Sequence, residues 1–124
     1  MSSLARLTLG VEGDQVVTAT MSGEIDLSNV AELTTSLLDA VPSEASGLLL
    51  DMTDVVYIDS LGVRMLVDLA RRLGWRNQEL VIVAPEGSRT RRVVSLTGVG
   101  SSLRLERSLE AAGSSMVDPQ RPQG

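Results

Sequence analysis

Residues 47–74, which read GLLLDMTDVVYIDSLGVRMLVDLARRLG, give the clearest indication of the fold. This stretch opens at residues 47–52 with an apolar run that does not alternate, which is typical of a strand covered on both faces in a parallel sheet. Residues 55–58 either extend this strand or follow it as a buried loop. From Ser60 onward the apolar residues recur at helical spacing, and Gly74 is placed to end that helix. The stretch predicts a buried strand that leads into an amphipathic helix.

The residues before this stretch predict a hairpin and a helix. Residues 4–11 and 15–22 alternate loosely between apolar and polar side chains around a short turn, which is typical of two antiparallel strands. Further on, Ser28 or Asn29 can cap a helix whose apolar residues recur at helical spacing until Pro42.

The residues that follow predict a second unit of strand and helix. Residues 80–84 form another apolar run before a proline, which indicates a buried strand. Ser88 then caps a short helix that ends at Gly98, with Val93 and Leu96 expected on its buried side.

The chain ends with a short strand, a helix and a polar tail. Residues 103–105 are the expected strand and residues 108–112 the expected helix, while residues 113–124 are polar, contain prolines and are expected to be disordered. We therefore predict one α/β domain over residues 1–112. Its sheet of four to five strands is mostly parallel with an antiparallel N-terminal strand, and about four helices accompany it.

The composition argues against an enzyme. A chain of 124 residues is long enough for one core, and it contains neither cysteine nor histidine. Those absences remove disulfides, thiol nucleophiles, the commonest general base and the commonest zinc ligands. All 11 basic residues are arginines, so a catalytic lysine is also missing. We expect no catalytic residues, no cofactor and no metal site.

The charge and the hydropathy pattern bear on partners and location. A net charge of -5 repels a phosphate backbone, so we expect no direct contact with nucleic acid. The sequence has no basic start followed by an apolar segment, and no apolar run approaches the roughly 20 residues that span a bilayer. We expect a cytoplasmic protein without direct membrane insertion.

The junction between the central strand and its helix is the most informative place for a function. Ser60 lies at or next to the N-cap, where a phosphate would face unpaired backbone N–H groups and the positive end of the helix dipole. A phosphate would add about -1.5 to -2 charges beside Asp59. The alternative is that Ser60 only caps the helix and Asp59 only forms the turn.

Leu61 lies on the polar side of the predicted helix. A helical wheel places it on the arc of Arg64 and Asp68, with Met65 at the boundary of the core stripe. Leu61 therefore either packs locally at the helix start or contacts a partner.

Four aspartates lie at or near predicted strand ends, where α/β proteins place their ligands; they are Asp26, Asp51, Asp54 and Asp59. Gathered together they would resemble a magnesium site or the acidic pocket of a phospho-aspartate receiver. Receivers also use a lysine near that pocket, and this chain has none. Turn and cap roles account better for these side chains.

Five segments carry a resemblance to a known family. They are Gly23-Glu24-Ile25-Asp26-Leu27, Leu50-Asp51-Met52, Tyr57-Ile58-Asp59-Ser60-Leu61-Gly62-Val63, Val81-Ile82-Val83-Ala84 and Leu96-Thr97-Gly98-Val99. In this order they resemble a STAS domain over roughly residues 4–112, and specifically a bacterial anti-sigma-factor antagonist. The most specific element is the Asp-Ser-x-Gly turn at residues 59–62.

The resemblance implies a STAS-like fold and partner switching. An antagonist of this kind binds an anti-sigma factor that is also a serine kinase, and so frees the sigma factor. The kinase phosphorylates a serine of the antagonist, here Ser60, and a phosphatase restores it. Many members have a second Ser or Thr where this chain has Leu61, so a single acceptor is expected. The expected partner-binding residues are Glu24, Asp26, Asp59, Leu61, Gly62, Arg64 and Met65, on a monomer or weak dimer.

Two other functions stay open at this point. The first is a subunit of a membrane transport complex, because STAS-like proteins also serve in that way. The second is a sensor that binds a small ligand. An aromatic content of 2% offers few side chains on which a nucleotide base could stack.

Overall fold

The fold is built on one five-stranded sheet. The computed structural model describes residues 6–12 and 16–117, and the side chains of residues 16–113. The elements are β1 (Arg6–Glu12), β2 (Val16–Ile25), α1 (Val30–Ala40), β3 (Gly47–Ile58), α2 (Ser60–Trp75), β4 (Glu79–Val83), α3 (Arg89–Thr97), the 3-10 turn η1 (Gly100–Ser102), β5 (Leu105–Glu106) and α4 (Leu109–Val117). The strands lie in the order β1-β2-β3-β4-β5, with β1 antiparallel to β2 and the other pairs parallel. The predicted α/β architecture is confirmed.

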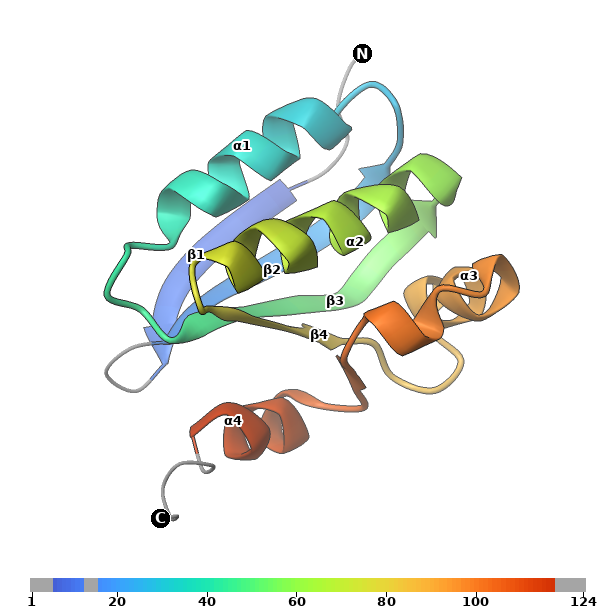
Figure 1. The fold of residues 1–124 in the computed structure, drawn as a ribbon. Coiled ribbons are helices and arrows are strands. Elements are labelled where there is room, and N and C mark those ends of the chain that lie inside the picture. Colours follow the sequence, from blue (N-terminus) through green and yellow to red (C-terminus); the bar gives the residue numbers. More distant parts are fainter. Residues whose placement is uncertain (1–5, 13–15, 118–124) are drawn as a thin grey trace.

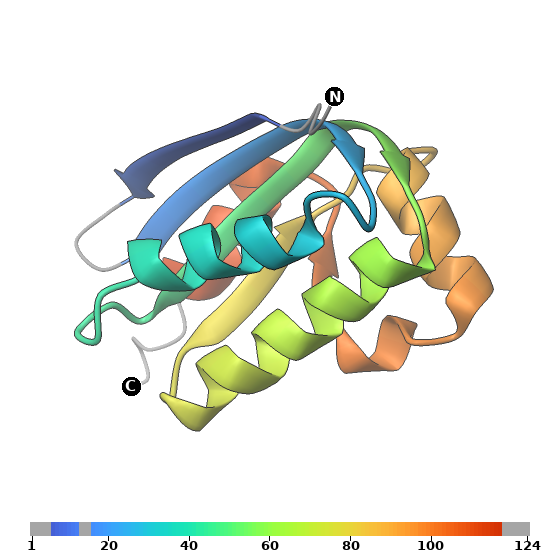
Figure 2. The ribbon, with the colours of Figure 1, turned by 90° about the horizontal axis from the view of Figure 1, so that it is seen from above.

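The helices are divided between the two faces of the sheet. Each parallel connection carries one helix, as expected for right-handed crossovers. Helices α1 and α2 lie side by side on one face, and α4 lies on the opposite face (Figures 1 and 2). Helix α3 lies beside the start of α2, at the end of the sheet where β3 finishes (Figure 2). The β3–α2 junction is therefore framed by α1 and α3.

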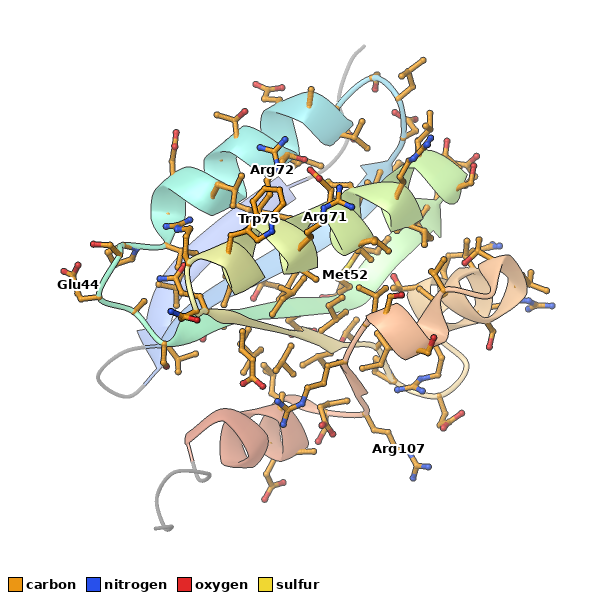
Figure 3. All side chains as sticks on the ribbon, in the orientation of Figure 1. Glu44, Met52, Arg71, Arg72, Trp75 and Arg107 are labelled. Atoms are coloured by element: carbon orange, nitrogen blue, oxygen red, sulfur yellow. The ribbon has the colours of Figure 1, made fainter. Side chains whose placement is uncertain are left out.

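Helix α2 is the predicted amphipathic helix and runs to Trp75. Leu66 and Leu69 are fully buried beneath it, whereas Arg71 and Arg72 are exposed on its outer side (Figure 3). The periodic apolar pattern of the sequence is therefore what holds this helix against the sheet.

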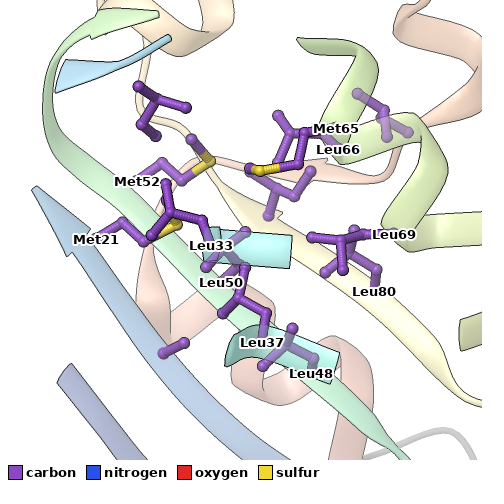
Figure 4. Close-up of a cluster of buried hydrophobic side chains, with 14 of the residues drawn as sticks. Met21, Leu33, Leu37, Leu48, Leu50, Met52, Met65, Leu66, Leu69 and Leu80 are labelled. Atoms are coloured by element: carbon purple, nitrogen blue, oxygen red, sulfur yellow. The ribbon is translucent and has the colours of Figure 1, made fainter. Parts of the chain in front are cut away.

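The core has a large part and a small part on opposite faces of the sheet. Leu48, Leu50 and Met52 of β3 pack beneath α1 and α2 with leucines of both helices (Figure 4). Leu49 points the other way and packs with Val81 beneath α4. Because both faces of β3 are covered, its first half contains no exposed residue, as the unbroken apolar run predicted. Burying one such leucine contributes about 1.5–3 kcal/mol.

The second half of β3 extends past its neighbour on one side. The strand continues through residues 55–58, so the prediction that they extend it is confirmed. Strand β4 pairs only with residues 47–51 of β3, whereas β2 follows β3 to the pair Ile25 and Ile58. The end of β3 therefore stands clear of β4, and the chain enters α2 there.

Helix α3 shows that one predicted orientation was wrong. Its buried residues are Thr90 and Val94, and Val93 is half-buried, but Leu96 is 79% exposed. Successive helical residues turn by about 100°, so Leu96 points roughly 200° away from Val94. The prediction placed Leu96 on the buried side because it is apolar, and the helix packs through Thr90 instead.

The C-terminal elements are displaced from the predicted ones. Strand β5 is Leu105–Glu106 rather than 103–105, although Leu103 is buried just before it. Helix α4 continues to Val117, past the domain boundary expected at residue 112. Residues 118–124 of the expected tail lie outside the described residues, as does the hairpin turn at 13–15. Within the described part of the chain, no helix is both long and apolar enough to cross a membrane.

Candidate functional site

The turn between β3 and α2 fixes the start of the helix through Asp59. The Asp59 carboxylate Oδ1 accepts hydrogen bonds from the backbone N–H of Leu61 at 3.0 Å and of Gly62 at 3.1 Å. The Asp59 carbonyl accepts from the Val63 N–H at 3.1 Å. Asp59 is therefore the N-cap, and Ser60 is the first residue inside the helix.

Ser60 is exposed, and its hydroxyl does not cap the helix. The alternative that Ser60 serves only as the N-cap is therefore wrong. The expectation that a phosphate there would face unpaired N–H groups also needs correction. The N–H groups of Leu61 and Gly62 are already bonded to Asp59, so a phosphate would have to displace that carboxylate to reach them.

Gly62 sets how closely the helix approaches the sheet. A Cβ atom at this position would lie 2.5 Å from Ile58 Cγ1 and 3.1 Å from Ile25 Cγ2, which is closer than side chains pack. Gly62 is buried, and the residue lies one turn or less from both Asp59 and Ser60. The start of α2 therefore packs directly against the ends of β2 and β3, and this close packing fixes the position of the turn.

The end of β2 places acidic residues beside this turn. Gly23 has a φ of 92°, in the left-handed region that favours glycine, and the pairing with β3 shifts register between Gly23 and Glu24. The last pair of the two strands is Ile25 and Ile58. Because Asp26 follows Ile25 just as Asp59 follows Ile58, the parallel pairing brings the two acidic residues to the same edge of the sheet.

The loop from β2 to α1 is held by its own side chains. The Asp26 carboxylate accepts from the Ser28 hydroxyl at 2.6 Å and from the Ser28 N–H at 2.9 Å. These two bonds, the hydroxyl bond first, hold the pKa of Asp26 below its usual value. The Asn29 side chain donates to the Glu24 carbonyl at 2.8 Å and accepts from the Asp26 N–H at 3.1 Å. Leu27, at 74% exposure, is thereby presented at the tip of an ordered loop.

Two grooves flank the first turns of α2. One of about 490 Å³ runs between α1 and α2, and its lining includes Val30, Thr34, Leu61, Arg64 and Met65. The other, of about 300 Å³, runs between α2 and the end of α3, and is lined by Ser60, Leu61, Val63, Arg64, Val67, Thr97 and Val99. Leu61, Arg64 and Val67 line both grooves, and Leu61 and Arg64 form the ridge between them at the first turns of α2.

The predicted partner-binding residues do not share one degree of exposure. Arg64 is exposed, Glu24, Asp26, Asp59 and Leu61 are half-buried, and Gly62 and Met65 are buried. The two buried residues can shape a contact surface only through the backbone and the groove floor. That these residues bind a partner remains a prediction.

Three residues near the site were indicated only by the family resemblance, because each lies in one of the segments that carry it. Leu27 belongs to no periodic pattern, and Thr97 and Val99 lie far along the chain from Ser60. Thr97 and Val99 lie near the site because α3 packs beside the start of α2, whereas Leu27 is brought to it by the pairing of β2 with β3.

The aspartates have local hydrogen-bonding roles. Asp26 and Asp59 bond to the loop and helix start described above, and Asp51 accepts from the Thr53 N–H at 3.0 Å and hydroxyl at 2.6 Å. Across residues 16–113, no three acidic side chains are gathered as they would be around a metal ion. Turn and cap bonds therefore account for Asp26, Asp51 and Asp59.

Known proteins share both this sequence pattern and this fold. The anti-sigma-F factor antagonist RsfB of Mycobacterium tuberculosis is 29% identical over 113 residues, which cover 90% of this chain and 91% of RsfB. The crystal structure of an anti-sigma factor antagonist from Mycobacterium paratuberculosis superposes with a TM-score of 0.81 at 26% identity, covering 95% of this chain and all of that one.

A more distant likeness concerns the fold alone. The antagonist SpoIIAA in its unphosphorylated form has a TM-score of 0.70 at 18% identity, over 89% of this chain and 95% of its own. The Bacillus protein has also been solved in its phosphorylated form, with a TM-score of 0.65. The sequence model of the STAS domain matches residues 11–112, which include every element that frames the β3–α2 turn. This chain belongs to the STAS domain family.

Proposed function

We propose that the chain is an anti-sigma-factor antagonist that binds an anti-sigma factor while Ser60 is unphosphorylated and is released from it by phosphorylation of Ser60. The observation that carries the proposal is an exposed Ser60 hydroxyl at the start of a helix that Asp59 already caps. The hydroxyl is accessible to a kinase, and the fold does not depend on it.

The similarity to named antagonists supports this assignment. RsfB and the protein of Mycobacterium paratuberculosis are both named for antagonism of an anti-sigma factor, and both match nearly the whole chain. SpoIIAA, which shares the fold, exists in phosphorylated and unphosphorylated forms. We assign the same modification to Ser60, because it is exposed and belongs to the Asp-Ser-x-Gly turn that carries the family resemblance.

The physical effect of the modification is electrostatic. A phosphate adds about -1.5 to -2 charges to an edge that already carries Asp26 and Asp59. The apolar Leu27, 74% exposed, and the half-buried Leu61 offer contact area at the same edge. A partner that packs on these leucines would have to remove the phosphate from water, and this desolvation weakens binding.

The remaining parts of the proposal follow from the composition. The chain lacks histidine, cysteine and lysine, so the kinase and phosphatase activities belong to separate proteins and this chain is their substrate. Both would act on it in the cytoplasm, where ATP and sigma factors are found. No cofactor is needed for the exchange of partners.

The first experiment locates the phosphate. The chain is incubated with ATP and each serine kinase of the anti-sigma-factor type from its own organism, and phosphopeptides are mapped by mass spectrometry. We expect one phosphate on Ser60 and none in Ser60→Ala. Ser88→Ala is the matched control, because Ser88 also begins a helix but its hydroxyl caps that helix. A phosphate that persists in Ser60→Ala would contradict the proposal.

The second experiment measures the effect on binding. By calorimetry against the anti-sigma factor, we expect Ser60→Ala to bind like the unmodified chain and Ser60→Asp to bind at least about tenfold more weakly. Ser88→Asp, which carries the same added charge outside the turn, should retain binding. Equal affinity of Ser60→Asp and the unmodified chain would overturn the switch.

A further inference from the structure

The backbone at the start of α2 offers a phosphate few free donors. The Asp59 carboxylate takes the N–H groups of Leu61 and Gly62, and the Asp59 carbonyl takes that of Val63. A phosphate on Ser60 would meet the Asp59 carboxylate as a like charge at close range. Asp59 therefore occupies three of the N–H groups through which a helix N-terminus usually receives a phosphate.

Arg64 is the cationic side chain placed to receive the phosphate instead. It follows Ser60 by four residues on α2, so the two side chains lie on the same face of the helix, about 5–6 Å apart at their Cβ atoms. Both side chains line the groove between α2 and the end of α3. An acidic group four residues before a basic one is also the favourable order on a helix.

Arg64 is exposed and makes no ion pair or hydrogen bond with the described residues. Its nearest acidic candidate on the helix is Asp68, which instead binds Arg71 at 3.0 Å and Arg72 at 3.0 Å. Those two arginines neutralise Asp68 and leave the Arg64 guanidinium available. Helical spacing therefore places Arg64 on the side of Ser60, and Asp68, which has two other arginine partners, does not compete for it.

We infer that Arg64 is the counter-charge that holds the phosphate of phosphorylated Ser60 on the outer surface of α2. The inference rests on the proposed function, since it assumes phosphorylation of Ser60. A guanidinium can bind two phosphate oxygens at once, which fixes the direction of the group as well as its charge. The phosphate then lies beside Leu61 and Arg64, over the groove between α2 and the end of α3, rather than on the helix N-terminus.

The test uses the full chain with phosphoserine incorporated at position 60 during translation, which requires no kinase. The second ionisation of the phosphate is followed by 31P NMR against pH, in the unmodified background and with Arg64→Gln. Loss of the guanidinium should raise the pKa of the phosphoserine by about 0.1–0.4 units, because the dianion loses its partner. Arg64→Lys should give a pKa between those of the unmodified background and Arg64→Gln, since lysine keeps the positive charge but cannot bind two phosphate oxygens as a guanidinium does.

Arg72→Gln is the matched control, because it removes one arginine from the same helix at a site already paired with Asp68. Its phosphoserine should titrate as in the unmodified background. An unchanged pKa in Arg64→Gln, or an equal change in Arg72→Gln, would overturn the inference. Folding of each variant is checked from its amide spectrum, and substitution of the exposed Arg64 should leave the core unchanged.

The outcome is separable from that of the proposed function. If the kinase modifies Ser60 and binding is lost while Arg64→Gln leaves the titration unchanged, the switch stands and the role of Arg64 fails. If Arg64→Gln shifts the titration but no kinase modifies Ser60, the role of Arg64 stands as a property of the phosphorylated chain and the proposed function fails.

Discussion

Two turns at the same edge of the sheet lead from a strand into a helix, and both contain a serine. In the β3–α2 turn the cap is the Asp59 carboxylate, and Ser60 is the next residue. In the β4–α3 connection the cap is Ser88 itself, whose hydroxyl accepts from the Arg91 N–H at 3.3 Å. Because Ser60 lies one residue after the N-cap, its hydroxyl does not cap the helix, whereas Ser88 lies at the N-cap and its hydroxyl does. The availability of a serine is therefore set by which neighbour caps the helix.

The two turns also differ in charge. Asp26 and Asp59 lie beside Ser60 at the start of α2. Helix α3 instead begins with three arginines and has no acidic residue in its first turn; the arginines are Arg89, Arg91 and Arg92. Arg91 is partly committed, because its Nε donates to the Ala84 carbonyl at 2.6 Å. Phosphorylation would deepen a negative charge at the first turn, and the sheet edge would then carry opposite charges at its two helix starts.

The largest effect on this comparison should come from filling the contact beneath the first turn. Gly62→Ala places a Cβ 2.5 Å from Ile58 Cγ1, so the helix start must move, at a cost of about 1–3 kcal/mol in unfolding free energy. Gly74→Ala is the control on the same helix, because a Cβ there meets nothing within 4 Å. It should be neutral or stabilising by up to about 1 kcal/mol. Urea denaturation measures both, and equal stabilities would contradict the close packing.

Removal of the two caps should have the next largest effect. Asp59→Ala leaves the N–H groups of Leu61 and Gly62 without their acceptor and should cost about 0.5–2 kcal/mol. Ser88→Ala removes one longer bond, to the Arg91 N–H, and should lie at the low end of that range. Chemical denaturation of the two variants tests the order, and a larger loss for Ser88→Ala would reverse the comparison.

Ser60→Ala should leave stability nearly unchanged. The hydroxyl is exposed and caps nothing, so the change should stay within about 0.5 kcal/mol. The thermal unfolding midpoint of Ser60→Ala, measured beside that of Ser88→Ala, tests the prediction. A loss as large as that of Asp59→Ala would mean that Ser60 supports the turn after all.

The smallest effect concerns the loop beside the turn. The Ser28 hydroxyl and N–H hold the pKa of Asp26 below its usual value, so their contribution to stability is present at neutral pH and is lost as the pH falls through that lowered pKa. Ser28→Ala keeps the N–H bond and removes the hydroxyl bond, and should raise the pKa of Asp26 toward its usual value. NMR titration of the Asp26 carboxyl carbon measures the change, and an unchanged pKa would contradict the role of the hydroxyl.

The elements of the site were more predictable than the roles within them. The apolar run at residues 47–52 and the helical spacing after Ser60 depend on local periodicity, and both elements lie where they were predicted. The assignment of the cap could not be made, because Asp59 and Ser60 are both good capping residues and differ by one position. Leu96 was misplaced because hydrophobicity was taken as burial, and the surface next to it has no covering element among the described residues.

The order of strands and helices, the burial of β3 and the position of a serine at the start of α2 were determined by the sequence alone. They follow from the spacing of apolar residues along short segments, and this spacing can be read without knowing any tertiary contact. Three features required the tertiary structure: the free hydroxyl of Ser60, the close packing at Gly62, where a Cβ would lie 2.5 Å from Ile58 Cγ1, and the two grooves that meet at Leu61 and Arg64. The hydroxyl depends on Asp59 rather than Ser60 taking the cap, and the other two features depend on the packing of α2 against β2, β3, α1 and α3. No periodic pattern of the sequence contains these distances.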